Sequence, residues 1–282
     1  MKIKINSDSF IEADDIKIGE NVRWGRNIDI KIRGIFSIGD NSVVGDRFFA
    51  RGENIKIGKY FFNVPTDSRG MNIGGGSSGL PYANLTIGDR CTCHTGHINL
   101  ARPVEIGDDV GISHDVDILT HGSWSTVLEG YPSAFKHVKI GNNVILGWKS
   151  IILPGVEIAN NVVVGSNSTV TKSLSNERAI YVGSPAVEIK KIKSPNLNKR
   201  KLIVAKIIED FKNLLSFYEY EECNISCESY PILKINNLKI NVENFEFTGY
   251  HDDVTDAFRD FIRRYGIRVF CARGFQNILK RK

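Results

Sequence analysis

The sequence lacks an apolar run long enough to cross a membrane. The best candidate, 144–156, is short and is interrupted by Lys149, whereas a spanning helix needs about 20 mostly apolar residues. The first residues alternate between apolar and polar types and have no continuous apolar stretch of the kind found in a signal peptide. We therefore expect a cytoplasmic protein without a membrane-spanning segment.

Cysteine is scarce, and its number, five, is odd, which argues against a disulfide framework. Cys91 and Cys93 are separated by one residue, and Cys223 and Cys227 by three, so neither pair has the spacing of a zinc ribbon or a redox site. We expect buried free thiols. The net charge of +5 is modest and no basic stripe with interleaved aromatic residues is present, so the sequence gives no sign of nucleic-acid binding.

Proline is also scarce, with 8 residues against 26 glycines, and this glycine excess indicates many tight turns. Apolar residues recur at an interval of six: Ile140, Leu146, Ile152, Ile158, Val164 and Val170. Earlier copies of the unit are Ile18-Gly19, Ile38-Gly39, Ile57-Gly58, Ile87-Gly88 and Ile106-Gly107. A period of six fits short strands separated by turns, with three units to a triangular coil and the apolar residues stacked inside.

Two breaks interrupt the repeat, at about 60–84 and 120–138, and breaks in such an array are usually loops on its functional face. The first contains a glycine cluster at 74–79 but lacks the Gly-Lys-Ser/Thr ending of a phosphate-binding loop. The second begins with Thr120-His121-Gly122-Ser123-Trp124-Ser125. We expect the chemistry in this second loop.

The repeat resembles that of the hexapeptide-repeat acyltransferases. The likeness covers roughly residues 10–193 and is densest at Ile140-Gly141-Asn142-Asn143-Val144 and Val170-Thr171-Lys172, and it closes with Val182-Gly183-Ser184-Pro185-Ala186. The resemblance implies a mainly β fold, a left-handed parallel β-helix, and a homotrimer whose active sites lie between adjacent prisms. The handedness comes from the resemblance, because spacing alone cannot give it.

In this family a loop carrying the catalytic histidine precedes the Ile-Gly-Asn-Asn-Val coil, so His121 is expected to be the general base that removes a proton from the acceptor. His97 and Asn99 lie near where related sugar acetyltransferases place an asparagine that contacts acceptor or acyl group. Trp124 belongs to a His-Gly-Ser-aromatic loop similar to those of enzymes of surface-glycan synthesis. These three residues are therefore expected to bind the acceptor, although the sequence does not identify the group that stabilises the oxyanion.

The family's usual acyl donor is acetyl-CoA, which serves as a co-substrate. The residues that match the family's donor-binding positions are Trp148, Ser166, Thr171, Lys172 and Lys190. Lysine suits phosphate as a point charge, which makes Lys172 the strongest of these candidates. Trp148 departs from the pattern, because relatives have a small residue there and an aromatic three places earlier, where this chain has Ile145.

The six-residue period stops near residue 194, which predicts a β-helix acyltransferase domain at 1–194 and a small α+β domain at 195–282. Helical spacing is clear from Val254 to Tyr265, with Gly266 placed to end the helix, and an earlier apolar stripe runs from Ile203 to Tyr218. Alternation at 238–242 and an apolar run at 267–270 predict strands. This second domain is expected to dock on the solenoid or to help choose the acceptor.

The leading hypothesis is an acetyl-CoA-dependent O-acetyltransferase acting on a sugar hydroxyl of a bacterial surface polysaccharide or its precursor. N-acetylation of an amino-sugar nucleotide would use the same machinery and stays open. A metalloenzyme resembling the γ-class carbonic anhydrases would need two histidines five residues apart, and neither His114 and His121 nor His94 and His97 have that spacing. A non-catalytic solenoid is the third alternative, and the His121 loop argues against it.

Overall fold

The computed structural model describes residues 1–63, 69–75, 79–220, 223–273 and 275. Its contacts divide the chain into two compact units, Met1–Lys193 and Ser194–Lys282. Each unit has an apolar core of its own, and no residue belongs to both cores.

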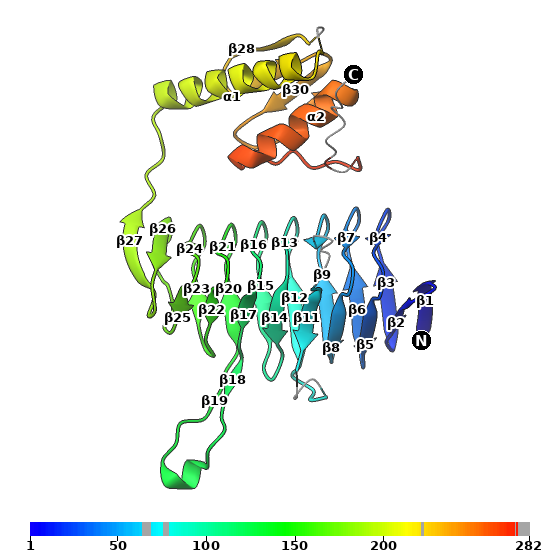
Figure 1. Ribbon diagram of the computed structural model, residues 1–282, viewed down its shortest axis with the longest axis vertical. Helices are drawn as coiled ribbons and strands as arrows, with labels where there is room; N and C mark the ends of the chain where they lie inside the picture. The colour runs from blue at the N-terminus through cyan, green and yellow to red at the C-terminus, as the bar shows by residue number, and fades with distance from the viewer. Residues whose placement is uncertain (64–68, 76–78, 221–222, 274, 276–282) are drawn as a thin grey trace. The chain divides into compact units, whose positions relative to one another are not determined.

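Three sheets form the faces of the first unit, a left-handed parallel β-helix, and successive coils contribute a strand to each sheet (Figure 1). The first sheet contains β1 (Lys2–Asn6), β2 (Ser9–Glu12), β5 (Asp29–Ile32), β8 (Phe49–Gly52), β11 (Met71–Gly74), β14 (Gly96–Asn99), β17 (Val116–Ile118), β22 (Ile151–Ile152) and β25 (Thr169–Val170). The second contains β4 (Arg23–Trp24), β7 (Val43–Val44), β10 (Phe62–Asn63), β13 (Thr92–Cys93), β16 (Gly111–Ile112), β21 (Ile145–Leu146), β24 (Val163–Val164), β26 (Ala179–Val182) and β27 (Val187–Lys191). The third contains β3 (Asp15–Ile18), β6 (Ile35–Ile38), β9 (Asn54–Ile57), β12 (Asn84–Ile87), β15 (Val104–Ile106), β20 (Val138–Ile140) and β23 (Glu157–Ile158).

Apolar residues six positions apart lie on successive sheets, as Ile140, Leu146 and Ile152 do, which confirms three units per coil. Register pairs in the third sheet join one isoleucine from each coil into a column: Ile38, Ile57, Ile87, Ile106, Ile140 and Ile158. Each of them is at most 4% exposed. Stacking therefore buries a continuous core that no single coil could form.

Five of these isoleucines, all but Ile158, are followed by a glycine, and the next coil comes close to that glycine. At Gly141 a Cβ atom would lie 2.6 Å from Asn160 Oδ1 and 2.9 Å from Asn160 N. The left-handed backbone conformation falls instead on asparagines, such as Asn143 (φ 54°) and Asn161 (φ 60°), a residue type that tolerates it. The repeat glycines lie at the corners as expected, but the positive φ falls two residues later, on asparagines or, in other coils, on Tyr60, Arg90 and Asp109.

The first predicted break, 60–84, is smaller than expected. β10 and β11 lie inside it, and β11 pairs with β8 and β14 as part of the first sheet. Of the glycine cluster at 74–79, residues 76–78 lie outside the described residues. The second break holds the hairpin of β18 (His121–Gly122) and β19 (Ala134–Phe135) with a 3-10 helix at Val127–Glu129, and this hairpin projects from the prism (Figure 1).

The second unit packs two helices and a short 3-10 turn with an antiparallel sheet. Its elements are α1 (Leu197–Phe217), β28 (Ile225–Ser229), β29 (Ile232–Ile235), β30 (Leu238–Asn241), β31 (Phe247–Gly249), α2 (Asp253–Ile262) and η2 (Arg263–Tyr265). Phe211 of α1 and Phe258 of α2 meet edge to face with ring centroids 4.8 Å apart. Asp252 caps α2 by accepting from Thr255 N at 2.7 Å, and Gly266 ends η2 at φ 79°.

The strand predicted at 267–270 does not form. This segment has no regular structure, and the carbonyl oxygen of Val269 accepts hydrogen bonds from Arg259 Nε at 3.1 Å and Nη2 at 3.0 Å. A buried guanidinium thus takes the place that a neighbouring strand would fill. No helix in the described part of the chain is long and apolar enough to span a bilayer.

Candidate active site

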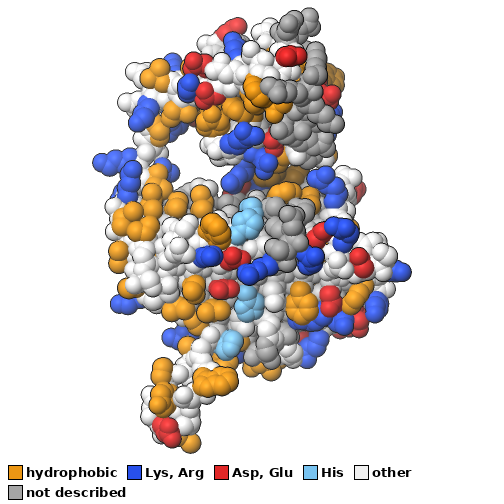
Figure 2. Space-filling view, viewed as in Figure 1, with side chains coloured by type: hydrophobic (Ala, Val, Ile, Leu, Met, Phe, Trp, Pro, Cys, Tyr) orange, Lys and Arg blue, Asp and Glu red, His pale blue; other side chains and the backbone are white. Residues whose placement is uncertain are grey.

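His121 lies where the chain leaves the prism, directly after β17 and at the start of the hairpin. In the hairpin register His121 is paired with Phe135, and the two rings stack with centroids 5.7 Å apart and an interplanar angle of 27°. Figure 2 shows histidine side chains on this face of the prism, near the base of the hairpin. The hairpin therefore holds the imidazole against an aromatic ring.

Asn99 fixes the orientation of the His121 ring. Its side-chain oxygen Oδ1 lies 2.8 Å from His121 Nδ1 and accepts hydrogen bonds from Thr120 Oγ1 at 2.7 Å and from the Ala101 backbone N–H at 3.1 Å. Because a backbone N–H can only donate, the Asn99 atom that faces it must be the oxygen. His121 Nδ1 must then carry the proton, which leaves the lone pair on Nε2 free, as a general base requires.

The amide nitrogen of Asn99 points to the first insertion, where Nδ2 donates to the carbonyl of Gly74 at 3.4 Å. A Cβ atom on the next residue, Gly75, would lie 2.5 Å from that nitrogen, and Gly75 has φ +122°. Asn99 and Thr120 are 2% and 0% exposed, so water does not compete for their hydrogen bonds. This burial favours a positioning role for Asn99 over the predicted contact with the acceptor.

His97, the second residue predicted to bind the acceptor, lies beside this network on β14. Burial lowers its pKa from the ordinary value, while the neighbouring Asp117 raises it and His121 lowers it. His97 and Asp117 are paired in register on the first sheet. A neutral imidazole next to the proposed base has one donor and one acceptor, which suits it to hold a sugar hydroxyl.

Trp124 lies farther out on the hairpin, and its side chain is fully exposed at 100%. Val127, Leu128 and Tyr131 of the same segment are exposed too, and Figure 2 shows apolar side chains over the hairpin. The contact of Trp124 with an acceptor stays a prediction. An exposed apolar surface of this kind is typical of an interaction site.

The residues predicted to bind the acyl donor lie in three places. Thr171 and Lys172 follow β25, at the same prism corner as His121 and two coils farther along the first sheet. Trp148 and Ser166 precede β22 and β25, at the corner on the other side of that sheet. Lys190 lies on β27, paired with Ile180 at the end of the second sheet. His97, Asn99 and His121 thus cluster, whereas the donor residues spread over two corners and an edge strand.

Sequence reasoning missed several residues of this corner. Thr120 supplies a hydroxyl to Asn99, Phe135 stacks on His121, and Arg102 lies with its guanidinium carbon 4.2 Å from the Tyr82 ring centroid and 5.3 Å from that of Phe135. Thr120 could have been predicted as a site residue, because it directly precedes His121 in the sequence. The others meet only because two insertions fold onto one corner, and no spacing in the sequence reports that.

The other histidines and cysteines of the first unit give no second site. His94 and His114 lie in contact at adjacent coil corners, with centroids 4.3 Å apart and the rings tilted by 50°. Burial, followed by the charge of His114, lowers the pKa of His94. Cys91 and Cys93 are buried free thiols as expected, and burial raises the pKa of Cys91 to about 12. Among the described residues no group of three or more His, Cys, Asp or Glu side chains could hold a metal ion.

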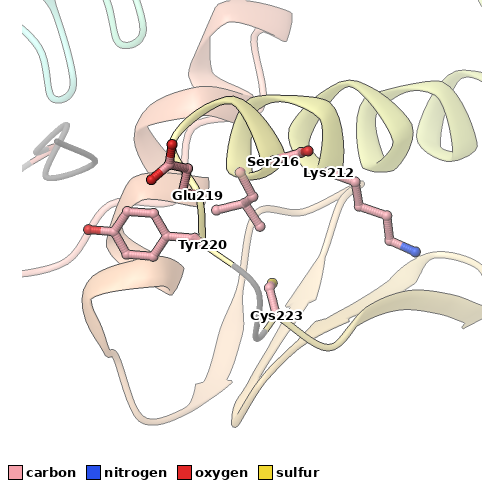
Figure 3. A pocket seen from close by; sticks show the side chains of 6 residues that line it. Lys212, Ser216, Glu219, Tyr220 and Cys223 are labelled. Atoms are coloured by element: carbon pink, nitrogen blue, oxygen red, sulfur yellow. The ribbon is translucent and has the colours of Figure 1, made fainter. Parts of the chain in front are cut away.

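The second unit has a pocket at the end of α1 (Figure 3). It is lined by Lys212, Leu215, Ser216, Glu219, Tyr220 and Cys223. Cys223, like Cys227 and Cys271, is only partly buried, unlike the buried thiols predicted. Burial raises the pKa of Cys223 to about 11. The thiol therefore stays protonated near neutral pH and is a poor nucleophile.

Residues 137–172 match the family model described as bacterial transferase hexapeptide (six repeats). The matched segment begins at the end of the hairpin and includes Trp148, Ser166, Thr171 and Lys172. No curated protein matches the sequence significantly.

Solved structures similar to this chain include three acetyltransferases. A hexapeptide-repeat acetyltransferase from Vibrio cholerae is 20% identical, with 49% of this chain and 74% of that one covered and a TM-score of 0.42. A maltose O-acetyltransferase from Clostridium difficile is 23% identical, with coverage of 65% and 70% and a TM-score of 0.31. The polysialic acid O-acetyltransferase OatWY is 24% identical, with coverage of 66% and 90% and a TM-score of 0.42.

Proposed function

We propose that the protein is an acetyltransferase that moves an acetyl group from acetyl-CoA to a sugar hydroxyl of a bacterial surface polysaccharide or its precursor. The observation that carries this proposal is the 2.8 Å contact between His121 Nδ1 and Asn99 Oδ1, because it leaves Nε2 as the basic atom. The hexapeptide match at 137–172 supports a transferase.

In the proposed reaction, His121 Nε2 takes the proton of the acceptor hydroxyl while the hydroxyl oxygen attacks the thioester carbonyl. The tetrahedral intermediate then collapses and breaks the carbon–sulfur bond. The CoA thiolate leaves and receives the proton from the His121 imidazolium. Asn99 stabilises the imidazolium, since its carbonyl oxygen accepts the Nδ1 proton throughout.

The donor residues fit an elongated anionic co-substrate. Lys172 and Lys190 are exposed and supply positive charge for the phosphates of acetyl-CoA. Lys172 lies two coils from the His121 corner, which corresponds to about 10 Å at roughly 4.8 Å per coil. An extended pantetheine arm would run along the coils from the base toward the C-terminal end of this unit.

We expect a homotrimer in which neighbouring copies complete each site. Trp148, at 55% exposure, and the fully exposed Trp124 lie on different parts of the unit, and both present apolar surface to water. A neighbouring copy that covered these surfaces would remove them from solvent and could bring the Trp148 corner of one copy to the His121 corner of the next.

Turnover of acetyl-CoA, measured as thiol release with a panel of glycans and nucleotide sugars, tests the proposal. We expect His121→Ala to keep the oligomer and CoA binding and to lose at least about 10²-fold in turnover. His137→Ala is the matched control, because His137 lies at the other end of the same loop, half-exposed beside Glu157. Near-normal turnover by His121→Ala would overturn the assignment of the base.

Acetylation of an amino-sugar nucleotide is the alternative outcome of the same panel. The neutral base and the donor residues would act in the same way on an amine, so only the acceptor that supports turnover separates O- from N-transfer.

A further inference from the structure

Arg102 occupies an unusual position at the corner that carries His121. It follows β14, and its backbone N–H donates to Thr120 Oγ1 at 3.1 Å. Its guanidinium lies over the rings of Tyr82 and Phe135, at 4.2 and 5.3 Å from their centroids. Phe135 in turn stacks on His121, so one aromatic ring separates the guanidinium from the proposed base.

Two other arginines at sheet corners are paired with carboxylates. Arg33 lies 2.7 Å from Glu53, and Arg90 lies 2.8 Å from Asp109. For Arg102, the described part of the chain provides no carboxylate, and Nη1 donates only to the carbonyl of Ala101 at 2.8 Å. Nε and Nη2 therefore present a donor pair that no described residue uses, and aromatic stacking holds it in place at little further entropic cost.

The position of Arg102 along the prism indicates which substrate it meets. Its coil precedes that of His121, because β14 pairs with β17 on the N-terminal side. The predicted donor residues Trp148, Ser166 and Lys172 all lie on coils that follow β17. The proposed path of acetyl-CoA thus leads away from Arg102, and His121 lies between the two.

We infer that Arg102 recognises an oxyanion on the acceptor, so that the substrate class is an acidic sugar. The planar donor pair fits a carboxylate or a phosphate oxygen pair, and the anchored group would set an adjacent hydroxyl at His121 Nε2. This inference rests on the proposed acetyl transfer. Two sources share the chemistry: the carboxylate of an acidic polysaccharide and the phosphate of a nucleotide sugar.

The test uses the full-length protein with acetyl-CoA and three acceptors: an oligogalacturonate, the same oligosaccharide with its carboxyls reduced to alcohols, and a uridine-diphosphate sugar. We expect Arg102→Gln to raise the KM for one of the two anionic acceptors by about 10- to 100-fold. The acceptor affected identifies the source of the oxyanion. The KM for acetyl-CoA and activity on the reduced oligosaccharide should stay unchanged, and Arg102→Lys should recover only part of the loss.

Arg33→Gln is the matched control, since Arg33 lies at the same kind of corner but is paired with Glu53, and we expect it to leave every acceptor KM unchanged. Calorimetric binding of the three acceptors to wild type and Arg102→Gln tests recognition without transfer. Equal effects of Arg102→Gln on charged and neutral acceptors, or none on either turnover or binding, would overturn the inference. Transfer that fails in every case while Arg102-dependent anion binding persists would instead contradict the proposed function.

Discussion

At the scale of single residues, three donors converge on the side-chain oxygen of Asn99: His121 Nδ1, the Thr120 hydroxyl and the Ala101 backbone N–H. Only the Ala101 backbone N–H is a donor in every case, so the Asn99 atom that it faces must be the oxygen. His121 Nδ1 and the Thr120 hydroxyl, which contact the same oxygen, must then be donors too. A buried amide with all its partners in place is rigid. The base is therefore oriented before any substrate binds, which is how positioning contributes to rate.

Replacing Asn99 with Ala should lower kcat by about 10²-fold or more, because the His121 ring would lose the acceptor that fixes its tautomer. Asn99→Asp keeps an oxygen at the same place and should restore most of the activity. The KM for acetyl-CoA should change little in both variants, since Asn99 lies on the other side of His121 from the donor residues. Steady-state kinetics of the two variants measures this.

A purely structural role for Asn99 would give a different pattern. Both variants would then lose activity in proportion to the folded protein lost, which circular dichroism and thermal unfolding would record. Full activity of Asn99→Ala at normal stability would contradict the positioning role.

At the scale of elements, the two insertions are coupled through one close contact. The segment after β11 approaches β14 so closely that a Cβ atom on Gly75 would lie 2.5 Å from Asn99 Nδ2. Gly75→Ala should therefore push the amide away from His121 and lower kcat by about 10-fold or more, with added strain from φ +122°. Turnover at saturating acetyl-CoA measures the loss.

Gly79→Ala is the control for this prediction. A Cβ atom there would meet nothing within 4 Å, so the substitution should leave activity and stability near wild type. Equal activity of the two variants would show that the contact between Gly75 and Asn99 does not matter to the site.

The sequence predicts elements well where their cause is periodic. The pairing of Ile140 with Ile158 follows from the spacing, because the two residues lie three six-residue units apart and have the same place in their units. The prediction of a strand at 267–270 was wrong. The apolar residues of this segment cannot show that the carbonyl of Val269 accepts a hydrogen bond from Arg259, which lies on α2.

The candidate site likewise has one part that the sequence predicts and another that it does not. His121 was predicted from the sequence because it opens a loop that interrupts the repeat, and because the resemblance to the hexapeptide-repeat acyltransferases places a catalytic histidine in such a loop. The hydrogen bond from its ring to Asn99 and the stacking of Arg102 on Tyr82 and Phe135 depend on how two insertions meet at a corner. Neither insertion contains a period that would report such a contact, so these relations could be found only in the structure.

At the scale of the whole molecule, two separate cores imply two independent stabilities. We expect the chain to unfold in two transitions, one for each unit. Phe258 is fully buried in the second core and packs on Phe211, and a Phe→Ala change in a core costs roughly 3–5 kcal/mol. Phe258→Ala should therefore lower one transition and leave the other in place, as calorimetry would show.

Leu146→Ala is the reciprocal variant, because Leu146 is fully buried in the first core. The substitution should lower the free energy of unfolding of the first unit by roughly 2–5 kcal/mol and so lower the other transition. If the second unit helps to choose the acceptor, then warming Phe258→Ala past its lowered transition should change the ratio of activities on acidic and neutral acceptors while acceptor-dependent thiol release from acetyl-CoA persists. An unchanged ratio would assign acceptor choice to the first unit alone. A single transition lowered by both substitutions would show that the two cores unfold together.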